Sequence, residues 1–293
     1  MNIIQNRKKY FLFSALIIIT GFVFMIVNAS AGRGIFNFDV EFSGGTSMLI
    51  DVGTAFENYE IESIVRENSD QTSPQIQRIL GTTQVSIKMT VVDDDTRIAL
   101  AEAFKERYGI KDEDISIDYF SPTIGEEMQA AAALALISAC AFMLVYITIR
   151  FSNFRTGAST ILGLLHDALV VLAAYAIFRI PLNYTFIVVI LTVIGYSINS
   201  TIFVFDRVRE NIKNLKDVSM EILINTSVQQ SVTRAINTSF STLLVVVSLY
   251  IFGVSAIKDF ALPILIGIVC GTYSSLFLAG SFLYVLSGKS TRS

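Results

Sequence analysis

The chain has 293 residues, of which 53% are hydrophobic and 16% charged, and its mean hydropathy is +0.59. Soluble proteins are about half apolar and about a quarter charged, so this composition excludes an ordinary soluble protein and predicts a membrane protein. Residues 29–127 hold 8 of the 22 basic and 19 of the 25 acidic residues. The net charge of this segment is therefore −11, and that of the rest of the chain is +8. This pattern predicts one acidic soluble domain between membrane spans, and its charge argues against a nucleic-acid partner.

The first apolar run, residues 10–27, follows three basic residues at positions 7–9. It has some features of a cleavable signal peptide, because the small residues 29–31 (Ala-Ser-Ala) resemble a cleavage site. Its 18-residue core is longer than the roughly 7–15 apolar residues of a signal peptide. We therefore expect a retained membrane anchor, with a cleaved leader as the alternative.

The next segment, residues 38–122, alternates between the two-residue period of strands and the period of helices. The predicted order is strand 46–52, helix 54–69, strands 75–80 and 83–92 joined at a tight Gly81-Thr82 turn, helix 93–109 and strand 114–121. This βαββαβ order predicts an α+β domain with a ferredoxin-like fold.

The acidic run Asp93-Asp94-Asp95 in this domain has two interpretations, a cation site or the start of a helix. Acidic side chains stabilise the first turn of a helix, which explains the run more simply. The domain has no cluster of histidine, cysteine or carboxylate residues with metal-ligand spacing, and no nucleophile beside a base. We therefore expect a binding or gripping role without a cofactor, not catalysis.

Five further apolar runs follow, each near the roughly 20 residues of one crossing: 128–149, 157–178, 182–205, 235–252 and 262–286. The prediction is an α-helical polytopic protein with a one-plus-five arrangement of spans, divided into 1–28, 29–127, 128–287 and a tail, 288–293. Twelve lysines and arginines lie on the side of the N-terminus and only Arg179 and Lys258 in the short loops opposite. Basic residues favour the cytoplasm, so both termini are predicted to be cytoplasmic and residues 29–127 extracytoplasmic.

An ionisable group deep in a membrane helix costs about 2.5–3.5 kcal/mol to insert, so each one is a functional candidate. Asp167 lies ten residues into the third run, beside the only histidine, His166. We expect His166 to contact Asp167 and not to bind a metal, because no second histidine or cysteine lies near it. The two cysteines, Cys140 and Cys270, lie in apolar runs and cannot crosslink the soluble domain.

Other polar residues within or at the mouth of a span are weaker candidates. They are Asn199, Ser200, Thr201, Asp206, Arg234 and Asn237. Hydroxyls commonly bond back to their own helix, and an arginine near the interface can extend into water, so a structural role is the alternative for each. Gly267 and Gly271, four residues apart, permit close contact between helices.

Four segments together resemble the SecF family of the bacterial Sec protein-export machinery. They are FDVEFSGGTSMLIDV (38–52), GYSINSTIFVFDRVREN (195–211), SVTRAINTSFSTLL (231–244) and KDFALPILIGIVCGTYSSLF (258–277). Gly44, Gly45, Thr46, Arg207 and Asn211 are the motif positions in the first two segments.

The resemblance implies a non-enzymatic plasma-membrane subunit of the resistance-nodulation-division type that pairs with SecD and associates with SecYEG. Through that complex it implies SecA and YajC as further partners, and exported unfolded polypeptide as cargo. It also implies that the proton gradient, or sodium in some organisms, helps to pull or release that polypeptide.

One position departs from the family pattern. The usual wording, Gly-Tyr-Ser-x-Asn-Asp-Thr, has an intramembrane aspartate as a proton-relay candidate, and this chain has Ser200 there while retaining Arg234. A serine does not exchange a proton in the physiological range, so coupling would depend on Asp167 or on SecD. The alternatives are a passive translocon stabiliser and a half-transporter for lipids or small hydrophobic molecules; an intramembrane enzyme is the weakest.

Overall fold

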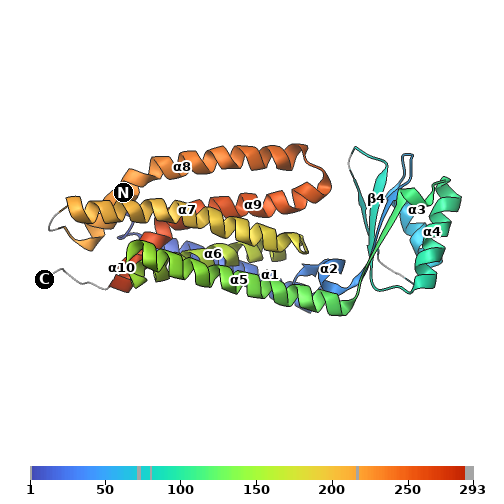
Figure 1. Ribbon diagram of the computed structural model, residues 1–293, viewed down its shortest axis with the longest axis horizontal. Coiled ribbons are helices and arrows are strands. Elements are labelled where there is room, and N and C mark those ends of the chain that lie inside the picture. Colours follow the sequence, from blue (N-terminus) through green and yellow to red (C-terminus); the bar gives the residue numbers. More distant parts are fainter. Residues whose placement is uncertain (1, 71–73, 80, 216–217, 288–293) are drawn as a thin grey trace.

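The computed structural model describes residues 2–70, 74–79, 81–215 and 218–287. A long helical bundle occupies one end of the molecule and a small sheet the other (Figure 1). Six helical segments of the described residues are long and apolar enough to cross a membrane. They are α1 (Arg7–Ser30), α5 (Pro122–Phe151), α6 (Phe154–Phe178), α7 (Thr185–Asn214), α8 (Met220–Phe252) and the continuous span of α9 (Ser255–Tyr273), the π-helical turn η2 (Ser274–Leu278) and α10 (Ala279–Ser287).

Several helices differ in extent from the apolar runs that predicted them. Helix α8 begins at Met220 instead of residue 235, because Ser219 caps it by accepting a hydrogen bond from the Ile222 N–H. Helix α5 likewise begins at Pro122, before residue 128. Hydropathy detects the apolar middle of a span and not its polar ends. As a result Arg234, expected at the mouth of its span, is the fifteenth of the 33 residues of α8.

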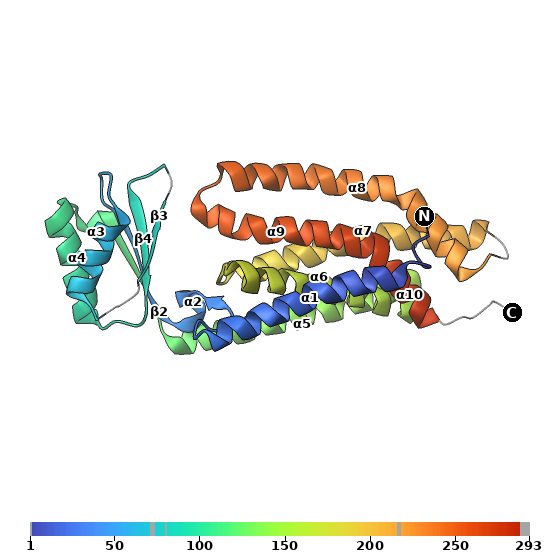
Figure 2. The ribbon, with the colours of Figure 1, turned by 180° about the vertical axis from the view of Figure 1, so that it is seen from behind.

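The sheet has four antiparallel strands in the order β3-β4-β2-β5. Their bounds are β2 (Gly45–Asp51), β3 (Gln75–Arg78), β4 (Gln84–Met89) and β5 (Ile115–Phe120), with a 3₁₀ turn, η1 (Asp112–Asp114), before β5. Helices α3 (Asn58–Asn68) and α4 (Asp94–Tyr108) cover the face that points away from the bundle (Figure 2). Met48, Ile87 and Phe104 lie in the core between the helices and this face. The opposite face, which carries Lys88, points toward the bundle.

The acidic run 93–95 begins α4, which confirms the helix-start interpretation. Asp93 is the N-cap and accepts a hydrogen bond from the Thr96 N–H at 3.0 Å. Hydrogen bonds from the Thr96 side chain and backbone lower the pKa of Asp93 from its ordinary value. The carboxylate is thereby favoured at the positive end of the helix dipole.

A short segment that the sequence assigned to the soluble domain belongs to the bundle instead. Strand β1 (Asn37–Phe38) pairs in parallel with β6 (Pro181–Leu182), which joins α6 to α7. Leu182, predicted to begin the fourth span, is therefore in a strand. The next turn, α2 (Val40–Ser43), places Phe42 in the core of the bundle.

Two adjacent glycines connect this segment to the sheet. Gly44 has φ 78°, and a Cβ there would lie 2.9 Å from the backbone of Pro122. A Cβ on Gly45 would lie 2.5 Å from the Met89 carbonyl oxygen. Only glycine permits this backbone conformation and this approach, so the pair lets β2 start directly beside the first turn of α5.

The centre of the bundle is the contact of α6, α7 and α9. A Cβ added to Gly267 would lie 2.2 Å from Val193 Cγ2, and one added to Gly271 would lie 3.0 Å from Ser197 Cβ. The close helix contact predicted for these two glycines is thus confirmed, and α7 is the partner. This contact places the polar residues of α9 within reach of α6.

Candidate functional site

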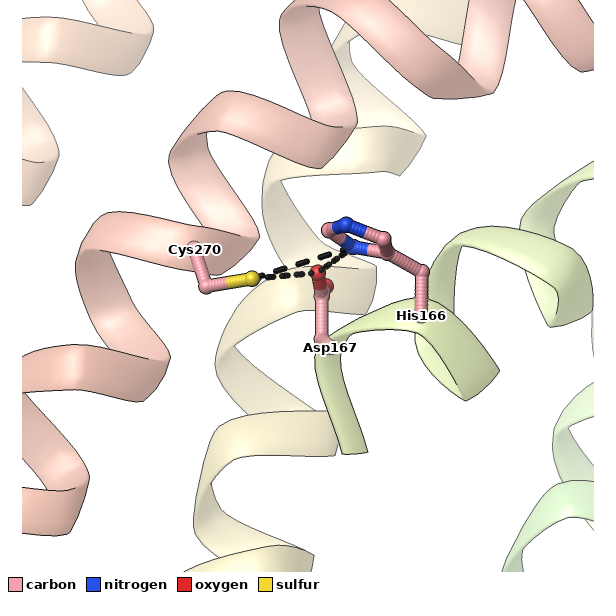
Figure 3. A group of neighbouring side chains, drawn as sticks. All are labelled: His166, Asp167 and Cys270. Atoms are coloured by element: carbon pink, nitrogen blue, oxygen red, sulfur yellow. Dashed lines mark hydrogen bonds and ion pairs between the residues drawn. The ribbon is translucent and has the colours of Figure 1, made fainter. Parts of the chain in front are cut away.

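Asp167 is completely buried and is the fourteenth of the 25 residues of α6, close to the middle of the span. Four side chains surround its carboxylate. Oδ2 accepts hydrogen bonds from Ser197 Oγ at 2.5 Å and Ser274 Oγ at 2.7 Å, and Oδ1 accepts from Cys270 Sγ at 3.2 Å and contacts His166 Nδ1 at 2.9 Å. We call these five residues the Asp167 cage; Figure 3 shows three of them.

Three elements build the cage. Helix α6 supplies Asp167 and His166, α7 supplies Ser197, and the α9–η2 span supplies Cys270 and Ser274. The absent side chain of Gly271 lets the span approach Ser197. Ser274 is the first residue of the π-helical turn, which rotates the residues that follow it relative to an ideal α-helix. Such single π-turns are frequent at functional sites.

His166 is held in one orientation by this arrangement. Its side chain is 6% exposed, and its Nδ1 faces Asp167 Oδ1 (Figure 3). With Asp167 in its carboxylate form, which only accepts hydrogen bonds, Nδ1 carries the hydrogen in that contact. The other nitrogen, Nε2, is buried and has no hydrogen-bond partner among the described residues.

The ligand atoms of His166, Asp167 and Cys270 all lie within 4.8 Å of one another, so a metal ion must be considered. The expectation that no cysteine lies near His166 is wrong, because Cys270 Sγ is 3.7 Å from its Nδ1. Nitrogen and oxygen ligands of tetrahedral zinc lie about 2.0–2.2 Å from the metal and hence about 3.4 Å apart. The 2.9 Å between His166 Nδ1 and Asp167 Oδ1 is instead a hydrogen-bond distance. A histidine that binds a metal through one nitrogen normally donates a hydrogen bond from the other, and His166 Nε2 has no such partner among the described residues. The residues fit a hydrogen-bonded carboxylate and not a metal centre.

The candidates on α7 divide between its buried and exposed sides. Ser200 and Thr201 are buried, 5% and 3% exposed, whereas Asn199 is exposed. Within this polar stretch the hydroxyl that reaches Asp167 belongs to Ser197, which the sequence did not single out. Cys270 and Ser274 were also missed as site residues. Only contacts between distant segments reveal these three residues, because serine and cysteine are common in membrane helices.

The charged end of α7 forms ordinary structural contacts. Asp206 pairs with Arg150 at 3.2 Å, and Arg207 pairs with Glu210 one turn further along. Asn211 donates to Ser227 Oγ and Gln230 Oε1, both at 2.9 Å, and so ties α7 to α8. These contacts fix the helix ends and do not reach the Asp167 cage.

Arg234 and Asn237 lie on an exposed strip of α8, away from the cage. The guanidinium of Arg234 lies 3.9 Å from the ring centroid of Phe203 on α7. We call the exposed polar residues of these two helices the α7–α8 polar face. Its members are Asn199, Arg234, Asn237, Thr238 and Ser241.

A second polar group lies where the sheet meets the bundle. The Asp39 carboxylate, 1% exposed, pairs with Lys88 of β4 at 2.5 Å, and Asn183 donates to it at 3.4 Å. Nearby, Glu41 accepts a hydrogen bond from the Tyr184 N–H at 3.1 Å. Burial raises the pKa of Glu41 above its ordinary value, against the smaller opposite effect of that bond. Lys88, Asn183, Glu41 and Tyr184 line a cleft of about 320 Å³ between the sheet and the bundle.

Comparison with known proteins identifies the family. The family profile described as "Protein export membrane protein SecD/SecF, C-terminal" matches residues 99–289. The SecF protein translocase subunit of Haemophilus influenzae is 34% identical over 281 residues, which cover 95% of this chain and 83% of the relative. The chain belongs to the SecD/SecF family.

Longer relatives and a solved structure of the family agree with this assignment. The SecDF translocase subunit of Bacillus subtilis is 31% identical over 97% of this chain, which spans only 38% of that relative. A crystal structure of SecDF from Thermus thermophilus, described as a translocon-associated membrane protein, matches with a TM-score of 0.78 and 28% identity. It covers 96% of this chain, which again spans 38% of the longer one. The resemblance inferred from the four sequence segments is therefore confirmed, and the chain is a multi-pass membrane protein related to protein translocase subunits.

Proposed function

We propose that this chain acts with SecD and the SecYEG channel to promote the translocation and release of exported polypeptides. The observation that carries the proposal is the similarity, over almost the whole chain, to named protein translocase subunits. Through the same complex SecA and YajC become partners. The proposed role is mechanical and involves no enzymatic step or cofactor.

The α7–α8 polar face supports a membrane partner. Four of its residues, 234, 237, 238 and 241, have the spacing of a single helix face, and all are exposed in this chain alone. Polar and charged groups facing hydrocarbon are unfavourable, so another protein surface should cover them. SecD fits, because SecDF relatives carry a segment equivalent to this chain within one longer polypeptide.

The proposed topology places one span before the soluble domain and five after it, with both termini in the cytoplasm. Its support is that the N-terminal end of α1 and the end of α10 lie at the end of the molecule opposite the sheet (Figure 1). Asn28 near the end of α1 donates to the Ala176 carbonyl oxygen, and Gly21 packs against Ala173, contacts that favour a retained anchor. The strand order and the two helices on one face support the ferredoxin-like fold for the extracytoplasmic domain.

We assign ion coupling in this chain to the Asp167 cage, because Ser200 cannot exchange a proton. Asp167 is an acidic side chain at the centre of a span, within a network that links three elements. One elementary charge moving through 100 mV gains about 2.3 kcal/mol. That is about a 50-fold bias in a conformational equilibrium, sufficient to drive a cycle.

The test is export of a preprotein into vesicles that contain this chain, its SecD partner and SecYEG, with and without an imposed gradient. Asp167→Asn should remove the gradient-dependent part of the SecDF contribution, while the exposed Asp95→Asn, the same substitution outside the bundle, should keep it. If Asp167→Asn retains the full response, the coupling role of the cage is wrong. If the contribution is insensitive to uncouplers from the start, the subunit is a passive stabiliser. Bound lipid in place of preprotein crosslinks would favour the half-transporter.

A further inference from the structure

We propose that the proton taken up by this chain binds to Nε2 of His166, with Asp167 remaining a carboxylate. The proposal rests on the ion coupling proposed above and identifies the atom that carries the charge. It starts from two facts: the Asp167 carboxylate is surrounded by donors, and Nε2 is the one buried nitrogen of the dyad without a partner in the described part of the chain.

The hydrogen bonds of the cage determine where a proton can be added. Each carboxylate oxygen already interacts with two neighbours, Oδ2 with Ser197 and Ser274, and Oδ1 with His166 and Cys270. A proton on either oxygen must displace or reverse one of these hydrogen bonds, and it removes the negative charge that strengthens the others. Each hydrogen bond to a charged group is worth about 1.5–3 kcal/mol. A proton on Nε2 displaces none, because its lone pair is free.

Charge balance favours the uptake of one proton by the dyad, and the hydrogen bonds described above favour Nε2 over the carboxylate as its position. In the part of the chain that the structure describes, the only basic group paired with Asp167 is His166. The dyad with neutral imidazole carries one net negative charge at the middle of the span, which low-polarity surroundings penalise. A proton on Nε2 makes an imidazolium 2.9 Å from the carboxylate, and the pair becomes neutral. Histidine is also the side chain whose charge ordinarily changes between about pH 5 and 8.

Among the described residues, the side chains that contact the dyad supply no competing charge near neutral pH. The α9–η2 span contributes Cys270, Ser274 and Tyr273, whose ring centroid is 6.2 Å from that of His166. Helix α7 contributes Ser197. Helix α1 lies on the other side of Tyr273, where the Tyr10 carbonyl oxygen accepts a hydrogen bond from the tyrosine hydroxyl at 2.9 Å. These groups are neutral, so the charge of the site depends on the dyad.

The chain offers a direct measurement, because His166 is its only histidine. Nitrogen-15 NMR of the protein labelled at histidine, in liposomes with the same pH on both sides, therefore reports this ring alone. As the pH falls from about 8 to about 5, we expect Nε2 to change from an unprotonated to a protonated nitrogen while Nδ1 keeps its hydrogen throughout. In Asp167→Asn the neutralising partner is gone, and we expect the signal of protonated Nε2 to lose intensity relative to the wild type at the same pH.

Two results would overturn the proposal: an Nε2 signal that stays unprotonated over this range, or a hydrogen found on Nε2 and lost from Nδ1 at the higher pH. Both are read on the wild-type chain, so a variant that fails to fold does not leave the question open. Cys140→Ser, outside the cage, is the control and should titrate as the wild type does. The readout is independent of export: normal titration with gradient-insensitive export would refute ion coupling but not the proton site.

Discussion

Replacing Gly267 by alanine tests whether the close contact between α7 and α9 positions the Asp167 cage. The new Cβ would lie 2.2 Å from Val193 Cγ2, whereas carbon atoms in good contact are about 3.5–4.0 Å apart. The two helices would have to separate by about 1.3–1.8 Å if their side chains kept their rotamers. Ser274 lies two turns beyond Gly267 on the same span, and its 2.7 Å bond to Asp167 would then exceed hydrogen-bond range.

The expected loss of stability follows from these two effects. Overpacking a helix contact costs about 1–3 kcal/mol, and losing a hydrogen bond to a buried carboxylate costs about 1.5–3 kcal/mol. Because the effects share one displacement, we expect about 2–4 kcal/mol in total. Gly163→Ala on α6 is the matched control, since a Cβ there meets nothing within 4 Å. It should be neutral or stabilising by up to about 1 kcal/mol, because alanine restricts the unfolded chain.

Thermal unfolding of the purified protein can be followed through its cysteines, since the chain has no tryptophan. In a Cys140→Ser background a thiol-reactive fluorophore reports only the buried Cys270, which belongs to the cage. Gly267→Ala should expose this thiol at a lower temperature, and adding Val193→Ala should restore part of the loss by removing the clashing γ carbons. Equal behaviour of the Gly267→Ala and Gly163→Ala variants, or no rescue by Val193→Ala, would refute the reasoning.

Two further predictions concern the junction of sheet and bundle. Lys88→Met leaves the Asp39 carboxylate buried without its cation. Because Lys88 is itself 25% exposed, we expect the loss of folding stability to be about 1–3 kcal/mol. Proteolysis of the soluble domain should be faster in this variant, whereas Lys88→Arg, which keeps the charge, should stay resistant. Burial raises the pKa of Glu41 in the folded protein above its ordinary value of 4.5, so ionisation of this carboxyl opposes folding. The contribution of protonated Glu41 to folding stability is fully present below pH 4.5 and is lost as the pH rises through the pKa of the folded state. Glu41→Gln should therefore raise the unfolding temperature near pH 8 and leave it unchanged near pH 4; the opposite pH dependence would contradict this.

The sequence was sufficient for the features that follow from local pattern. Apolar length predicted six spans, alternating periodicity predicted the strands and helices of the soluble domain, and Asp93 with its acidic neighbours predicted a helix start. It was insufficient for the ends of α5 and α8, whose capping residues Ser121 and Ser219 carry no hydropathy signal. The β1–β6 pairing was also missed, since two-residue strands 144 positions apart leave no periodic pattern.

The site was predicted only in part for a similar reason. Asp167 could be identified because a carboxylate in an apolar run is costly on its own. Ser197, Cys270 and Ser274 could not, because each has an ordinary structural explanation in its own helix and acquires meaning only through its distance from Asp167. A polar network in a helical bundle is thus identified from its most costly member, and the remaining members require the contacts between helices.

The connections of α6 show how a change in the cage could reach the soluble domain. At the end of α6, Arg179 donates to the Gly34 carbonyl oxygen at 3.0 Å, and two residues later β6 pairs with β1. Strand β1 leads directly to Asp39, which holds Lys88 of the sheet. Helix α9 provides a second link, because it carries Cys270 in the cage and Asp259 at the cleft beneath the sheet. The Asp39–Lys88 pair is therefore a contact through which a displacement of the bundle can reach the sheet, in addition to the direct chain connection from β5 into α5. Lys88→Met, which breaks the pair, should leave the nitrogen-15 signals of His166 unchanged.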